Sequence, residues 1–257
     1  MRQPVRPKKA LGQHLLTDQD VAQAIVTSLR SSGPVLEVGP GTGVLTQYLV
    51  RDPQFALKVV EIDGESVRYL LEHFPALAPN LYEADFLQMD LRKIFPDNFT
   101  VIGNFPYNIS SQIFFKILDY RQQIPEVVGM VQKEVAERLA AGPGSKTYGI
   151  LSVLLQAWYG IEYLFTVGEG AFVPPPKVKS AVIRLTRNAR TTLDCDEALF
   201  RRVVKTTFNQ RRKTIRNSLK PILSTLPKLP EFIPYLDARP EQLSVEEFVD
   251  LTKSLSL

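Results

Sequence analysis

Cysteine and histidine are scarce in this chain of 257 residues, and long apolar runs are missing. Cys195 is the only cysteine, which excludes an intramolecular disulfide and a zinc site built from several cysteines. With only His14 and His73 beside it, we expect no metal. No run approaches the roughly 18 apolar residues of a membrane-spanning helix, and no apolar signal segment follows the basic N-terminus. These absences predict a cytoplasmic protein that does not enter a membrane.

Acidic residues are missing from two stretches, 1–10 and 201–220, of a chain whose formal net charge is +4. Several Lys and Arg residues in each stretch permit a nucleic-acid partner. The second stretch is expected to be helical, and one broad helical face would then suit phosphate contacts. A solvated charged helix is the alternative. The candidate phosphate-binding residues are Arg201, Lys205, Arg211, Arg212, Lys213 and Arg216, of which Arg201, Lys205, Arg212 and Arg216 would share that face.

Short apolar runs alternate with amphipathic helical segments as far as residue 187. Alternation of this kind, with short links, predicts a doubly wound and mostly parallel α/β sheet. The last two runs have no helix between them, which indicates an antiparallel addition at one edge. The seven predicted strands are 34–38, 57–61, 80–84, 99–103, 127–131, 160–165 and 180–185.

The pattern changes after residue 187, where helical segments and a proline-punctuated stretch replace the strands. Two helices are predicted at 194–209 and 211–219, and Ser244 begins a capping box for a last helix. We therefore predict two domains, a catalytic domain over 1–187 and a small all-helical domain over 188–257. The first sixteen residues are expected to form a flexible basic arm.

A glycine-rich turn and a series of polar residues follow the predicted strands. The turn Gly39-Pro40-Gly41-Thr42-Gly43 joins a buried strand to a helix, where backbone amides can approach a ligand closely. Glu61 ends the second strand and is placed to bind a ribose diol. Asp85 and Asn104 end the next two strands, and Glu37 lies within the first. These residues predict one ligand crevice, and their spacing fits NAD as well as S-adenosylmethionine.

The segment Asn104-Phe105-Pro106-Tyr107 ends the fourth predicted strand and carries the most specific chemistry. The Asn104 side chain offers a carbonyl acceptor, and the extended residue before Pro106 can aim its own carbonyl outward. Tyr107 offers a ring for stacking. Such a group can grip the exocyclic amine of an extruded base. A simple strand-ending turn is the alternative for this segment by itself.

With these motifs taken together, the chain resembles the small-subunit ribosomal RNA adenine N6,N6-dimethyltransferases, members of the class I S-adenosylmethionine-dependent methyltransferase superfamily. The resemblance covers nearly the whole chain, and its last two blocks are the most specific. The residues that carry it are 9–16, 37–43, 104–110, 132–134, 171–178 and 208–216. It implies a seven-stranded, Rossmann-like methyltransferase sheet with a small helical C-terminal domain.

The resemblance also implies the roles of the site residues. The segment around His14 and Leu16 would close over the cofactor, although this family usually has Asn at position 14 and Phe at 15. Phe172 is similar to the aromatic residue that stacks on the target adenine opposite Tyr107; core packing is the alternative for Phe172, as it is for His14. The implied cofactor or base contacts are His14, Leu16, Gly39, Gly41, Glu61, Asp85 and Asn104, and the implied catalytic residues are Asn104, Pro106, Tyr107 and Phe172.

The implied reaction is methyl transfer from S-adenosylmethionine to N6 of two adjacent adenines in a 3′-terminal hairpin loop of small-subunit ribosomal RNA. A monomer acting on a pre-ribosomal particle is expected. Three alternatives stay open at this point. The chain could be an NAD-dependent oxidoreductase, a non-catalytic RNA-binding assembly factor on the same fold, or a methyltransferase of large-subunit RNA.

Overall fold

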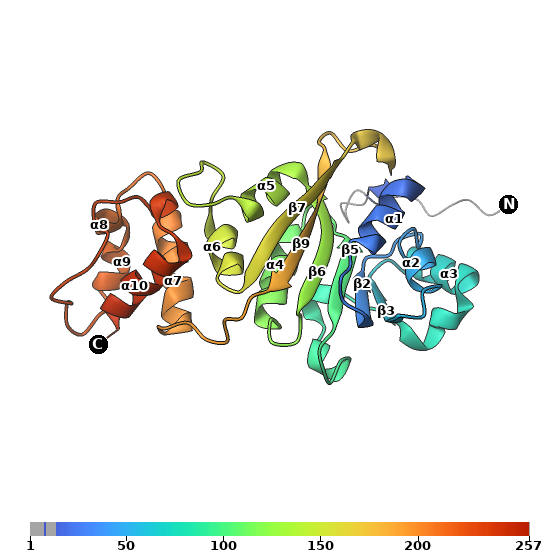
Figure 1. The fold of residues 1–257 in the computed structure, drawn as a ribbon, viewed down its shortest axis with the longest axis horizontal. Coiled ribbons are helices and arrows are strands. Elements are labelled where there is room, and N and C mark those ends of the chain that lie inside the picture. The colour runs from blue at the N-terminus through green and yellow to red at the C-terminus, as the bar shows by residue number, and fades with distance from the viewer. Residues whose placement is uncertain (1–7, 9–13, 257) are drawn as a thin grey trace. The chain divides into compact units, whose positions relative to one another are not determined.

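A computed structural model describes residue 8 and residues 14–256 of the chain (Figure 1). Within these residues seven strands form one sheet in the order β4-β3-β2-β5-β6-β9-β7. Strands β2 to β6 are parallel neighbours, and β9 runs antiparallel to β6, as predicted. The strands are β2 (Gly33–Val38), β3 (Phe55–Glu61), β4 (Leu81–Glu83), β5 (Thr100–Asn104), β6 (Glu126–Gln132), β7 (Tyr159–Val167) and β9 (Ser180–Arg187).

The central strands are buried along nearly their whole length, as expected for parallel strands covered on both faces. Gly103 of β5 and Gly129 of β6 are register partners. A Cβ atom on Gly129 would lie 2.4 Å from the Phe105 ring, and one on Gly103 would lie 2.5 Å from the Val38 carbonyl oxygen. The two glycines therefore leave the space that the Phe105 ring fills directly after β5.

Phe105 is only 1% exposed and packs edge-on against Phe114, with ring centroids 5.8 Å apart. Phe114 belongs to α4 (Ser110–Asp119), the helix that follows β5. Because its ring is anchored beneath the sheet end, Phe105 fixes where the chain leaves β5. The residues on either side of it, Asn104 and Pro106, are therefore held at the end of this strand.

Short helices connect the parallel strands. Asp18 caps α1 (Gln19–Thr27) by accepting a hydrogen bond from the Val21 amide at 3.1 Å. The helix expected to begin near residue 42 is shorter in the structure, because α2 (Thr46–Leu49) starts only after the glycine turn. Gly43 has φ = +80°, which a right-handed helix cannot include. The helix α3 (Gly64–His73) packs against β3 and β4.

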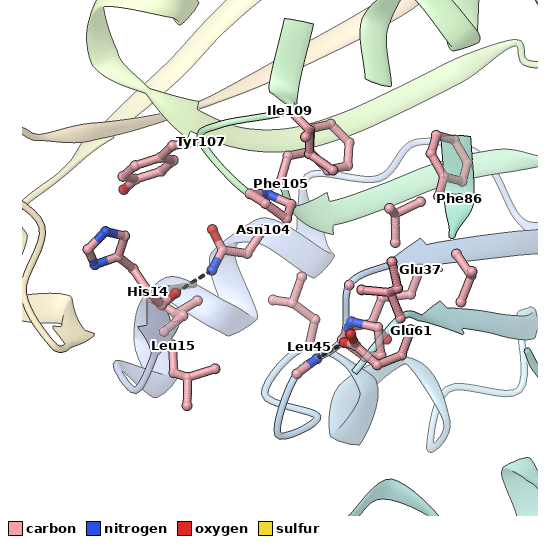
Figure 2. A pocket seen from close by; sticks show the side chains of 18 of the residues that line it. His14, Leu15, Glu37, Leu45, Glu61, Phe86, Asn104, Phe105, Tyr107 and Ile109 are labelled. Carbon is pink, nitrogen blue, oxygen red and sulfur yellow. Dashed lines mark hydrogen bonds between the residues drawn. The ribbon is translucent and has the colours of Figure 1, made fainter. Parts of the chain in front are cut away.

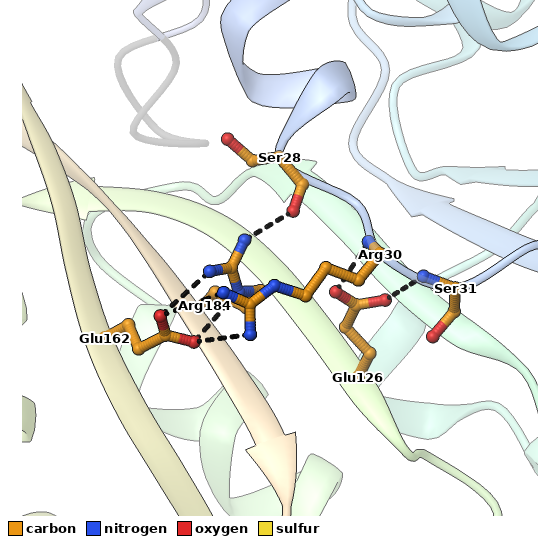
Figure 3. Close-up of polar contacts among 6 residues, drawn as sticks. All are labelled: Ser28, Arg30, Ser31, Glu126, Glu162 and Arg184. Carbon is orange, nitrogen blue, oxygen red and sulfur yellow. Dashed lines mark hydrogen bonds and ion pairs between the residues drawn. The ribbon is translucent and has the colours of Figure 1, made fainter.

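A cluster of charged groups ties the amino-terminal ends of β2 and β6 to the strands beside them (Figure 3). The Glu126 carboxylate accepts hydrogen bonds from the main-chain amides of Arg30 and Ser31 at 2.9 and 2.8 Å. Arg184, 7% exposed, donates to both Glu162 carboxylate oxygens and to the Ser28 carbonyl. This cluster joins the end of α1 to three strands.

The chain divides into two compact units, one of residues up to 136 with 161–187, the other of 137–160 with 188–257. One break between the units lies at 187/188, and residues 137–160 also belong to the second unit, which the sequence pattern did not indicate. The helix α5 (Lys133–Ala140) crosses one boundary between the units. None of the described helices is long and apolar enough to span a membrane.

In the second unit, α6 and α10 pack against α7. A capping box begins α10, as predicted: Ser244 accepts from the Glu247 amide, and the Glu247 side chain accepts from the Ser244 amide. Phe208 at the end of α7 packs between the rings of Tyr148 and Phe248, so residues from both sequence segments form one core. The helices are α6 (Ile150–Gln156), α7 (Glu197–Phe208), α8 (Ile215–Ser218), α9 (Lys220–Leu223) and α10 (Val245–Leu255).

Candidate active site

A cavity of about 190 Å³ opens at the carboxyl ends of β2, β3 and β5 (Figure 2). Ligands of open α/β sheets bind at this edge, where strand order changes direction. The cavity brings together nine of the ten predicted catalytic and cofactor-contacting residues: His14, Leu16, Gly39, Gly41, Glu61, Asp85, Asn104, Pro106 and Tyr107. Further lining residues that the sequence did not single out include Leu15, Val44, Leu45, Ile62, Phe86, Leu87 and Ile109.

The glycine-rich turn shapes one wall of the cavity. Gly41 has φ = +58°, and a Cβ atom on it would lie 3.2 Å from the Leu15 side chain. The Gly41 amide donates a 3.0 Å hydrogen bond to Glu61, whose other oxygen accepts from the Asp63 amide at 2.9 Å. Glu61 is 3% exposed, and its burial raises the pKa of the carboxyl despite these two hydrogen bonds. The turn and the end of β3 thus form one connected polar wall.

Glu37 supplies a second buried carboxyl to the same cavity. It is 1% exposed and accepts a 2.7 Å hydrogen bond from the Thr46 hydroxyl. Burial, with a smaller contribution from the Glu61 charge, raises the pKa of Glu37 to about 8. The carboxyl is therefore mostly protonated at neutral pH. A cation placed beside it would favour the ionised form.

Asp85 both caps a short turn and lines the cavity. It caps the short turn Phe86–Gln88 by accepting a 2.9 Å hydrogen bond from the Leu87 amide. It also lines the cavity, next to Ala84 and Phe86. A carboxylate has more than one acceptor site on its oxygens, so capping leaves capacity for a ligand.

Asn104 ends β5, and its amide orientation follows from one contact. The side-chain nitrogen donates a 3.1 Å hydrogen bond to the main-chain carbonyl of His14. Since a carbonyl only accepts, the nitrogen must face His14, and the Asn104 side-chain oxygen lies on the opposite side (Figure 2). Asn104 therefore presents an acceptor, the group needed to hold an amine proton.

The Tyr107 ring stacks on the His14 imidazole, with centroids 5.3 Å apart and planes 29° apart. Its hydroxyl is hydrogen-bonded to the Ser180 hydroxyl. His14 Nδ1 lies 3.0 Å from the Pro174 carbonyl oxygen, so this nitrogen carries the proton and donates. His14 consequently connects Tyr107 and Asn104 to the segment that contains Pro174.

The structure does not bring Phe172 to the cavity. The short strands β1 (Leu15–Leu16) and β8 (Phe172–Val173) pair antiparallel, with Leu16 opposite Phe172. Both side chains belong to one hydrophobic cluster, and each is 2% exposed. The expected stacking of Phe172 opposite Tyr107 is therefore corrected to core packing, and the ring beside Tyr107 is that of His14. Side chains alternate along β8, so Val173 is exposed where Phe172 is buried.

The same strand pair corrects the end of the predicted flexible arm. Leu15 and Leu16 are held in β1 instead of extending freely. Lys8 forms an ion pair with Asp63 at the start of α3 and lies 3.4 Å from a Glu65 carboxylate oxygen. The other arm residues, 1–7 and 9–13, lie outside the described residues.

The basic segment contains two helices, as predicted, but both are shorter than expected. Arg201 and Lys205 lie on α7, which ends at Phe208, and a turn follows before the four-residue α8. Arg211 donates to the Ser145 and Lys146 carbonyls, and Arg216 pairs with Asp237 at 2.9 Å. The helical spacing behind the predicted broad face is therefore interrupted between Phe208 and Ile215. The basic side chains come from separate elements of the second unit.

The parallel sheet and its cavity define the fold of a Rossmann-like, S-adenosylmethionine-dependent methyltransferase, and solved structures agree. The crystal structure of a dimethyladenosine transferase from Plasmodium falciparum aligns with a TM-score of 0.77 and 25% identity, covering 93% of this chain and 96% of that one. The 23S rRNA methyltransferase ErmE aligns with a TM-score of 0.66 and 27% identity, covering 95% and 100%.

The particular family follows from the sequence comparisons. The family model for ribosomal RNA adenine dimethylases matches residues 5–255, and the chain belongs to this family. Ribosomal RNA small subunit methyltransferase A of Parabacteroides distasonis is 64% identical over 251 residues, covering 96% of this chain and 93% of the relative. The protein of the same name from Cytophaga hutchinsonii is 60% identical over 255 residues, covering 98% of each. The resemblance predicted from the motifs is confirmed.

Proposed function

We propose that this protein transfers methyl groups from S-adenosylmethionine to N6 of two adjacent adenines in a 3′-terminal hairpin loop of small-subunit ribosomal RNA. Family membership and the names of the close relatives support the reaction class and the RNA. The single observation that carries the chemistry is the Asn104 amide oxygen, turned away from His14 in the cavity that also holds Glu61 and Asp85.

The cavity residues fit S-adenosylmethionine. Each Glu61 oxygen accepts one main-chain hydrogen bond, so each retains acceptor capacity for a ribose hydroxyl. Asp85 would accept from the adenine amine of the cofactor, and Gly39 and Gly41 allow close approach of the backbone. Glu37 would lie toward the cationic methionine end, where its raised pKa would fall on binding. When bound, the cofactor supplies an activated methyl group on a cationic sulfur.

Asn104 would accept a hydrogen bond from the target amine through its side-chain oxygen. A main-chain carbonyl would accept a hydrogen bond from the second N–H of the same amine. The Pro106 carbonyl already accepts from the Ile109 amide at 3.2 Å, which favours the Phe105 carbonyl for this role. Two such acceptors favour a tetrahedral nitrogen whose lone pair points at the methyl group. Orientation of this kind can supply roughly 7–11 kcal/mol, and no strong base is required.

RNA phosphates would contact the basic residues of the second unit. The candidates are Arg201 and Lys205 on α7 and, beyond that helix, Arg211, Arg212, Lys213 and Arg216. For Arg211 and Arg216, phosphates would replace the contacts with the Lys146 carbonyl and with Asp237. Binding should weaken steeply with added salt because neutralised phosphates release counterions. We propose that the protein acts as a cytoplasmic monomer on the pre-ribosomal particle.

Tritiated methyl transfer into small ribosomal subunits that lack adenine dimethylation tests the proposal, with large subunits as the parallel substrate. The expected product is N6,N6-dimethyladenine in the small subunits, with two methyl groups on each of two adenines. No incorporation into small subunits by a folded protein that binds S-adenosylhomocysteine would overturn the proposal and favour a non-catalytic assembly factor.

A large-subunit substrate is the second candidate, because the structural likeness to a 23S rRNA methyltransferase extends over 95% of this chain. Label found only in large subunits would establish it. An NAD-dependent reaction leaves Asn104 and Tyr107 without a role. Thermal stabilisation by NAD but not by S-adenosylhomocysteine would be needed to restore that alternative.

A further inference from the structure

The hydroxyl of Tyr107 meets the hydroxyl of a serine that lies far away in the sequence. Ser180 is the first residue of β9, where it is the register partner of Gln132 at the end of β6. It is fully buried, and its hydroxyl is hydrogen-bonded to that of Tyr107. Neither the strand-end motif nor the glycine turn contains this residue.

The hydrogen bond with Ser180 holds the hydroxyl end of the Tyr107 side chain, whereas the other contacts of Tyr107 hold its backbone and ring face. The Tyr107 carbonyl accepts a 3.2 Å hydrogen bond from Ser110, and the ring stacks on His14. These contacts fix the backbone and one face of the Tyr107 ring, but the χ2 torsion of an aromatic side chain is only weakly restricted. A hydrogen bond at the hydroxyl adds a distant fixed point. Because Ser180 belongs to the sheet, that point is as rigid as the sheet itself.

The phenol is able to donate in this contact at all physiological pH values, since burial raises its pKa above the ordinary value. Ser180 can in turn donate or accept through the same hydroxyl. Satisfying a buried serine would by itself be an ordinary structural role. Ser180 also has a second role, because it contacts the Tyr107 ring that faces the cavity.

We propose that Ser180 is a positioning residue of the methyl-transfer reaction, holding the Tyr107 ring at the angle on which the target base stacks. The inference rests on the proposed function. It predicts that Ser180 affects turnover through Tyr107, without contacting the cofactor or the RNA.

A double-mutant cycle tests this coupling. Ser180→Ala and Tyr107→Phe each remove the same hydrogen bond from opposite ends, and both keep the stacking ring. Each is expected to lower kcat on small subunits about three- to tenfold, with a smaller change in KM for S-adenosylmethionine. The double variant should be no slower than the slower single variant, because the shared bond is lost only once. Multiplying losses, or a Ser180→Ala variant within twofold of the unchanged protein, would overturn the proposal.

A matched control separates positioning from folding. Ser152 is also a fully buried serine, and its hydroxyl donates to the Arg138 carbonyl in the second unit. Ser152→Ala should lower the melting temperature and leave kcat per folded molecule unchanged. If it reduces kcat as much as Ser180→Ala does, a general loss of buried serine contacts explains both, and the proposal is wrong.

A spectroscopic measurement keeps the inference separate from the proposed function. The ring ¹³Cζ signal of Tyr107, assigned by its disappearance in Tyr107→Phe, should shift in Ser180→Ala and stay in place in Ser152→Ala. If the unchanged protein methylates neither subunit, the proposed function fails, and an unshifted signal would then overturn the Ser180 contact as well. If methylation proceeds and the signal does not shift, only the Ser180 proposal fails.

Discussion

The two ends of the sheet hold carboxyl groups in opposite ways: Glu37 and Glu61 at one end are buried, while the Glu162 side chain at the other is 43% exposed. At the carboxyl ends of the strands, Glu37 and Glu61 are held by a hydroxyl and by main-chain amides, and burial raises the pKa of both. Near the amino-terminal ends, Glu162 lies against Arg184, whose hydrogen bond holds the pKa of that carboxyl below its usual range (Figure 3). At the amino-terminal ends of the strands, the charge of the carboxylate is compensated by an arginine of the protein. At the carboxyl ends, the carboxyl oxygens remain acceptors whose charge a ligand would compensate.

This difference indicates that the amino-terminal ends of the strands contribute to stability, while their carboxyl ends carry the candidate active site. A fully hydrogen-bonded ion pair contributes to folding but has no capacity left for a substrate. Groups with raised pKa values in a cavity cost stability and are candidates for function. Substitutions at the two ends should therefore separate turnover from stability.

The largest effect on turnover is expected from Asn104→Ala at the cavity end. It removes the acceptor that orients the amine, so kcat should fall by about 100-fold or more, while RNA affinity and melting temperature stay nearly unchanged. Rates of methyl transfer and filter binding of RNA measure the two quantities. Turnover within a few-fold of the unchanged protein would contradict the proposed geometry.

The largest effect on stability is expected from Arg184→Ala at the other end. It leaves the Ser28 carbonyl and Glu162 without their buried donor, which should cost about 2–3 kcal/mol because Glu162 is partly solvated. Urea unfolding measures this loss, and kcat per folded molecule should not change.

Arg30→Ala is the matched control for Arg184→Ala, since Arg30 pairs with the same carboxylate but its side chain is 62% exposed. A surface pair of this kind contributes about 0–1 kcal/mol. Equal losses for the two arginines would show that burial does not distinguish them, and the contrast between the ends of the sheet would weaken.

A smaller effect, on the pH dependence of stability, is expected from Glu37→Gln, which mimics the protonated carboxyl. The pKa of Glu37 in the folded state is about 8, against an ordinary value of 4.5, so between these two pH values the folded state holds the proton more tightly than the unfolded state. Stability contributed by this group must then fall as pH rises from about 4.5 to 8. Unfolding in urea at pH 5 and pH 8 should show a smaller decrease for Glu37→Gln. The same decrease in both proteins would rule out the raised pKa.

The smallest effect is expected from His14→Asn. The variant keeps the main-chain carbonyl that orients Asn104 but removes the ring that stacks on Tyr107. We expect a change in KM for the ribosomal substrate of about two- to fivefold, with kcat nearly constant. A fall in kcat as large as that of Asn104→Ala would mean that the His14 side chain, and not its carbonyl, governs the acceptor.

Much of the first unit, which contains the cavity, could be predicted because the sequence signals for its strands, turn and site residues are local. Apolar runs of strand length, the glycine turn and the strand-end residues Glu61, Asp85 and Asn104 are adjacent to the elements they follow. Parallel strands bring such positions to one edge of the sheet, where these three residues line one cavity. The helix expected through 211–219 is shortened to α8 (Ile215–Ser218), because a tertiary contact determines where the preceding helix ends. Phe208 is used in the core of the second unit, and the chain turns directly after it.

The sequence by itself determined the order of strands and helices, the glycine turn and the identity of the strand-end side chains, since these depend on residue type and spacing. Only the tertiary structure decided that the His14 carbonyl orients Asn104, that Phe172 packs inward while His14 faces Tyr107, and that Ser180 reaches the Tyr107 hydroxyl. The two hydrogen bonds among these contacts join residues that are 90 and 73 positions apart in the sequence. The pairing of β1 with β8 and of β6 with β9 creates them, and the local pattern of these segments does not identify which strand pairs with which.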